Sequence, residues 1–149
     1  MVKGRWLLLS AIAFLSGCEG NVKLGYFAED RARAISRTQE FRRFYDEKNF
    51  AGMYELGGPA MKSAVTQEQF ISSAQASYSQ FGKRKSSTLM GSSCFPNEVR
   101  LVYQSEFEQG TVTEWMVWQL PADKALLLMY RIEPGEAEFR KESQVGCPS

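Results

Sequence analysis

The spacing of apolar residues changes from three or four positions to two near Gly82, and this change constrains the fold more than any other feature. Before Gly82, residues 26–48 carry apolar side chains at helical spacing, which predicts a long amphipathic helix. A short helix is predicted over 50–56, ending at a Gly-Gly-Pro sequence. Thr66 followed by Gln69 forms a capping-box pattern and predicts a further helix that ends at Gly82.

After Gly82 the chain reads as strands separated by short turns, over residues 85–94, 99–107, 111–120 and 125–132. Consecutive strands with tight connections pair antiparallel, as a meander. Helices followed by strands predict an α+β domain over residues 26–132. We expect the N-terminal helices to pack on a curved antiparallel sheet of about four strands, whose concave face surrounds the first helix.

The N-terminus has the layout of a secretory signal peptide. Lys3 and Arg5 precede an apolar run over 6–15, which is too short to span a bilayer. Leu15-Ser16-Gly17-Cys18 then resembles the lipobox of bacterial lipoproteins. This resemblance implies removal of residues 1–17 and acylation of Cys18, for example with palmitate. The alternative is an ordinary secretory signal with a chance cysteine.

An acylated Cys18 would anchor the mature chain to the membrane of the bacterial envelope, facing the periplasm. Residues 18–25 then form a lipidated tether. Glu19 is a weaker signal for inner-membrane retention than aspartate, so the outer membrane is the preferred location.

Charge and cysteine content restrict the partners and cofactors. Removing residues 1–17 takes away Lys3 and Arg5 and leaves 16 of the 18 basic side chains, against 17 acidic ones. This nearly neutral net charge predicts no nucleic-acid partner. With Cys18 acylated, Cys94 and Cys147 remain, and we expect a disulfide that pins the polar tail 133–149. Two free thiols or an intermolecular bridge are the alternatives. Two cysteines without any histidine offer too few ligands, so neither a metal nor a cofactor is expected.

The sequence contains little that indicates catalysis. The absence of histidine excludes the usual nucleophile–histidine systems, and there is no phosphate-binding or dinucleotide-binding glycine motif. A carboxylate and tyrosine site with Asp46 or Glu114 is the less favoured enzymatic alternative, because we expect both to be surface charges. The first helix carries five arginines, which we expect to form a solvated face: Arg31, Arg33, Arg37, Arg42 and Arg43.

Residues 34–132 resemble a group of uncharacterised bacterial lipoproteins with a small cystatin-like or NTF2-like domain. The likeness rests on residues 41–46, 50–54, 66–70 and 81–84, together with Glu114 and residues 130–132. At 123–125, Asp-Lys-Ala stands where the family often has a glycine turn and a tryptophan. The resemblance implies a cone-shaped sheet but no activity.

Two non-enzymatic functions remain. In the first, the domain binds another envelope protein in an accessory or assembly role, through an outer patch that contains Met116 and Trp118. The tail could instead cover that patch, and association of two copies is a further alternative. In the second, a small apolar ligand binds inside the cone. The candidate lining residues are Phe41, Tyr45, Leu101, Tyr103, Trp115 and Tyr130.

Overall fold

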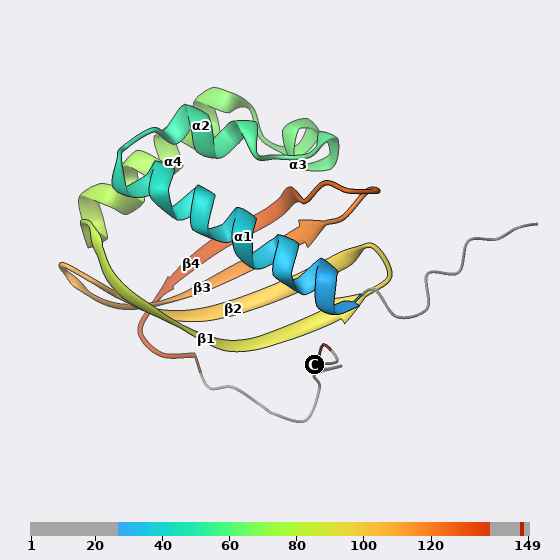
Figure 1. Ribbon diagram of the computed structural model, residues 1–149. Helices are drawn as coiled ribbons and strands as arrows, with labels where there is room; N and C mark the ends of the chain where they lie inside the picture. Colours follow the sequence, from blue (N-terminus) through green and yellow to red (C-terminus); the bar gives the residue numbers. More distant parts are fainter. Residues whose placement is uncertain (1–26, 138–146, 148–149) are drawn as a thin grey trace, which may run out of the picture.

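In the part of the chain that the structure describes, four helices cover one face of a four-stranded antiparallel sheet (Figure 1). This computed structural model describes residues 27–137 and residue 147. In chain order the elements are α1 (Phe27–Asp46), α2 (Phe50–Glu55), α3 (Pro59–Ala64), α4 (Gln67–Phe81), β1 (Arg84–Phe95), β2 (Glu98–Phe107), β3 (Gly110–Gln119) and β4 (Leu126–Pro134). The α+β class and the antiparallel sheet expected from the sequence are confirmed.

The local sequence explains where the helices begin and end. The side chain of Asn49 accepts a hydrogen bond from the Gly52 amide at the start of α2. At α4, Thr66 Oγ1 accepts from the Gln69 amide at 3.2 Å, and Gln69 Oε1 accepts from the Thr66 amide at 3.0 Å. The predicted capping box is therefore present.

One helix was not predicted. The Gly-Gly-Pro sequence does not form a loop after α2, because Pro59 occupies the first turn of α3. Proline suits that position, where its missing amide hydrogen and fixed φ cost nothing. Just before α3, the Gly58 amide donates to the Leu127 carbonyl, and the Leu127 amide donates to the Leu56 carbonyl. These bonds attach the α2–α3 connection to β4.

The sheet follows chain order, β1-β2-β3-β4, and its strands alternate side chains between two faces. We call the face under the helices the inner face and the opposite one the outer face. On β3, Val112, Met116 and Trp118 point inward and are buried, whereas Trp115 points outward. The indole Nε1–H of Trp118 donates to Thr38 Oγ1 of α1 at 3.0 Å, which ties α1 to the centre of the sheet.

Beyond β4 the chain turns onto the outer face. β4 extends to Pro134, two residues past the predicted domain end. Thr113 Oγ1 donates to the Gly135 carbonyl and accepts from the Ala137 amide, both at 2.9 Å. Gln104 Nε2 donates to the carboxylate of Glu136 at 2.9 Å. Residues 135–137 therefore lie against β2 and β3.

The predicted intramolecular disulfide is present between Cys94 and Cys147, whose Cα atoms are 4.9 Å apart. Cys94 Sγ lies 3.6 Å from the carbonyl oxygen of Phe27, so the bridge joins the C-terminal region to the end of β1 beside the start of α1. The signal peptide 1–17, Cys18, the tether 18–25 and most of the predicted tail lie outside the described residues. None of the helices that the structure describes has the length and apolar character needed to span a membrane.

Candidate functional site

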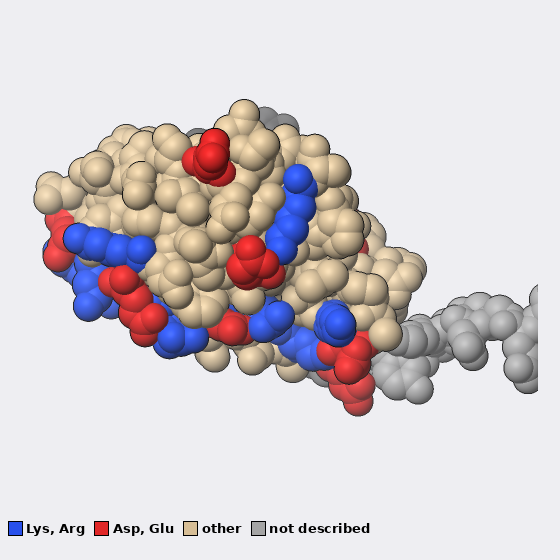
Figure 2. All heavy atoms as spheres, turned by 90° about the horizontal axis from the view of Figure 1, so that it is seen from above, with Lys and Arg blue, Asp and Glu red and all other residues tan. Residues whose placement is uncertain are grey.

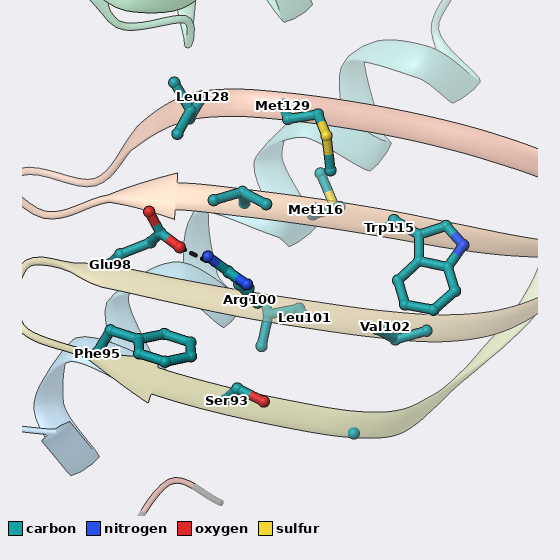
Figure 3. A pocket seen from close by; sticks show the side chains of 12 residues that line it. Ser93, Phe95, Glu98, Arg100, Leu101, Val102, Trp115, Met116, Leu128 and Met129 are labelled. Carbon is teal, nitrogen blue, oxygen red and sulfur yellow. Dashed lines mark hydrogen bonds and ion pairs between the residues drawn. The ribbon is translucent and has the colours of Figure 1, made fainter. Parts of the chain in front are cut away.

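A groove of about 570 Å³ crosses the outer face of the sheet (Figure 3). All four strands contribute side chains to it, because the inner-outer alternation puts one residue in two on this face. Val102 of β2 and Val117 of β3 form its buried centre, and Met129 of β4 is 42% exposed. The groove is thus apolar at its centre and open to solvent along β4.

Charged side chains at the groove occur in pairs of opposite sign. Arg100 Nε donates to Glu98 Oε1 at 2.6 Å, and its guanidinium stacks over the Phe95 ring at 4.7 Å. Near the other end, Arg131 forms an ion pair with Glu133, which also accepts from Trp115 Nε1 at 3.3 Å. The groove therefore combines an apolar centre with a polar rim that has no large excess of either charge.

The structure corrects the predicted interface residues. Met116 and Trp118 are 1% and 0% exposed and belong to the inner face. The residues of β3 that do reach the outer face are Trp115 and Val117. The alternation along β3 was predicted correctly, but the assignment of its two faces was wrong, because Thr38 of α1 receives the Trp118 indole on the helical side.

The predicted ligand pocket is only partly assembled. Phe41, Leu101 and Tyr103 are buried on the inner side together with Tyr45, and Tyr130 packs on Phe41 with ring centroids 4.7 Å apart. Trp115, the sixth predicted residue, lies on the opposite face.

The space inside the predicted pocket is small. The cavity that Tyr45 and Tyr130 line together with Met53 and α4 measures about 130 Å³. Pockets for drug-sized ligands usually measure roughly 300–1,000 Å³. Side chains therefore occupy most of the interior where a ligand was envisaged.

Glu114 was expected to be a surface charge, and this prediction is wrong. It is the most deeply buried carboxylate of the described chain, with 1% exposure. Its Oε1 accepts from Arg42 Nη2 at 3.1 Å and from Ser105 Oγ. Its Oε2 accepts from the Tyr130 hydroxyl at 3.0 Å. Glu114 occupies an inward position of β3, so its charge can be retained only with these partners.

The same cluster corrects the expectation that all five α1 arginines are solvated. Arg42 is buried, and its guanidinium lies 3.8 Å above the centre of the Tyr103 ring. Asp46 forms no pair with Arg42, which lies one helical turn before it, but binds Arg84 of β1 at 2.8 Å. Arg43 and Glu47 do form the local pair that their spacing allows, at 3.1 Å.

Burial also affects the tyrosines of the cluster. It raises the pKa of Tyr103, an effect that Glu114 increases and Arg42 opposes. Burial and the neighbouring Glu114 raise the pKa values of Tyr130 and Tyr45 as well. These phenols remain neutral over the physiological range. With every oxygen of Glu114 already accepting a hydrogen bond, we interpret the cluster as structural.

Within residues 27–137 and 147, no three histidine, cysteine, aspartate or glutamate side chains are grouped to hold a metal ion. No known protein family and no curated protein matches the chain. A solved structure of Bdellovibrio bacteriovorus Bd1075 is similar, with a TM-score of 0.49 and 10% sequence identity. The match covers 77% of this chain and 44% of that one, so the chain spans less than half the length of that protein.

Proposed function

We propose that this protein is a non-enzymatic, lipid-anchored lipoprotein of the bacterial envelope that binds another envelope protein through the outer-face groove. Leu15-Ser16-Gly17-Cys18 supports the anchor, which would face the periplasm and preferably lie in the outer membrane. The single observation that carries the binding role is the apolar groove of about 570 Å³ on a sheet face that the helices do not cover.

The composition of the groove supports a protein partner. Interfaces typically combine an apolar centre with a polar rim that excludes water. Here Val102 and Val117 supply the centre, and the Glu98–Arg100 pair supplies part of the rim. A partner that fits this surface presents a short apolar segment flanked by side chains of both charges. Confinement to the membrane surface would raise the effective concentration of such a partner.

Two exposed methionines provide a matched test. Met129 lies in the groove at 42% exposure, and Met90 lies outside it on β1 at 47% exposure. A photo-crosslinking residue is placed at position 129 of the lipidated protein in its own envelope. The protein that becomes crosslinked to it is then identified by mass spectrometry. The same residue at position 90 is the control. The captured protein is then purified and its dissociation constant is measured directly.

We expect Met129→Glu to weaken that binding by at least about tenfold, because it places a charge on the apolar surface that a partner would cover. Met90→Glu should change the affinity little. Equal affinity of the wild-type protein and Met129→Glu, or equal loss in both variants, would contradict the proposal. Sedimentation of the protein alone shows whether the captured neighbour is a second copy.

A further inference from the structure

A second hollow lies between the last turns of α1 and the start of β1. It measures about 460 Å³, and four basic side chains line it: Arg42 and Arg43 from α1, and Lys83 and Arg84 where β1 begins. Seen from the helical side, Lys and Arg are interspersed with Asp and Glu along the edge of the molecule (Figure 2). Two acidic side chains, Asp46 and Glu47, line the same hollow. We call this hollow the basic cleft.

The three arginines at the basic cleft are each paired with a carboxylate. The three ion pairs are Asp46–Arg84, Glu47–Arg43 and Glu114–Arg42, the last of them with a carboxylate of β3. Lys83 has an exposed side chain that forms no ion pair with a described residue. The carboxylate of Glu108 lies beside it and accepts a hydrogen bond from the Lys83 backbone amide at 2.9 Å, but the Lys83 ammonium group itself is not paired with a described residue.

The guanidinium groups at the basic cleft are also crowded and incompletely bonded. Burial lowers the pKa of Arg84, and the neighbouring charge of Arg42 lowers it further. Two buried atoms at the cleft have no hydrogen-bond partner among the described residues: Arg42 Nε and the carboxylate oxygen Oδ1 of Asp46. Arg43 and Glu47 are both more than half exposed, with side-chain values of 56% and 52%, so their pair can exchange easily with another anion. An anion in the cleft would reduce the repulsion between the arginines.

We propose that the basic cleft binds a phosphate group. Arginine presents planar N–H groups that match the oxygens of phosphate, and the lysine adds a point charge. Here such donors come from two different elements, α1 and β1, and Gln39 adds an uncharged amide. Two sources share this chemistry: free inorganic phosphate and the headgroup of an anionic phospholipid.

The first arm titrates the full-length protein in uncharged detergent with inorganic phosphate, at constant ionic strength kept with sodium chloride. Isothermal calorimetry and the NMR signals of the arginine side chains report binding. We expect saturable binding that Lys83→Gln weakens by about threefold or more. Lys85→Gln, an exposed neighbour outside the cleft, is the matched control and should leave the affinity unchanged.

The second arm repeats the calorimetric titration with phosphatidylglycerol dispersed in the same uncharged detergent, compared with phosphatidylcholine. If Lys83→Gln binds phosphatidylglycerol more weakly than Lys85→Gln does, and the two variants do not differ with inorganic phosphate, the phosphate group that binds is that of a lipid headgroup. The proposal fails if neither probe binds saturably, or if both lysine variants lose affinity equally. Because Met129→Glu leaves the basic cleft intact, it should bind phosphate normally, which separates this result from the groove experiment.

Discussion

Glu114 is buried with a full set of partners, and its removal tests whether the inner cluster is structural. Glu114→Gln keeps the size of the side chain but leaves Arg42 as a buried cation without a counter-charge. We expect a loss of about 3–5 kcal/mol in the free energy of unfolding. Urea denaturation measures the loss. Replacing both partners, with Arg42→Met and Glu114→Leu, should recover much of it, and no recovery would contradict this account.

Tyr103 makes a separate prediction about alkaline pH. Its pKa is raised mainly by burial, so the unfolded chain loses this proton at a lower pH than the folded chain does. The stabilisation is therefore complete below about pH 10, where unfolded tyrosine is still neutral, and is lost as the pH rises through the folded pKa. The expected loss is at most about 1.4 kcal/mol per pH unit for each such tyrosine.

Tyr103→Phe removes this titration and should flatten the loss of stability above pH 10. The measurement is the free energy of unfolding at pH 7, 9 and 11 for both proteins. The pH 7 value gives the effect of the lost hydroxyl alone. Identical pH dependence of the two proteins would show that Tyr103 does not contribute to alkaline unfolding.

Among single residues, sequence reasoning failed where a charge interrupts an apolar pattern. Glu114 has the same parity on its strand as Met116 and Trp118, which were expected on the outer face but face inward in the structure. We expected a surface charge because a carboxylate is rarely buried without a partner. The partner, Arg42, lies 72 positions away in sequence, and no local pattern connects the two residues.

At the scale of elements, periodicity and caps were reliable because they depend on neighbouring residues. The bounds of α1, α4 and the four strands lie close to the predicted ones. Which face of the sheet the helices cover depends on long-range packing. The prediction placed Trp115 on the inner face and Trp118 on the outer face, and the structure has the reverse. Because each face of β3 carries one tryptophan, the sequence alone does not show which face is covered by the helices.

The capping box of α4 is an element-scale prediction. Thr66→Ala removes the hydroxyl that accepts from the Gln69 amide, so we expect a loss of about 1 kcal/mol in stability. Ser72→Ala, at an exposed position inside the same helix, should cost nothing, because alanine is the better helix former. Thermal unfolding of both variants checks this. A similar loss in the two variants would mean that the cap is unimportant.

For the whole molecule, the disulfide connects the C-terminal region to the end of β1, across 53 positions of sequence. In the chain-entropy account, closing a loop of this length stabilises the fold by about 4 kcal/mol. Unfolding of the same chain with and without a dithiol reductant measures this directly. Comparing one sequence in two redox states avoids the packing change that a substitution at buried Cys94 would bring.

Loss of the bridge should also affect the groove, because Ser93 and Phe95 flank Cys94 and line it. We expect faster amide hydrogen exchange in the last residues of β1 after reduction, with little change in α4, which packs on α2. Uniform acceleration over the whole chain would show global destabilisation alone. Unchanged exchange at β1 would mean that the strand holds its place without the C-terminal region, and that the groove does not depend on the bridge.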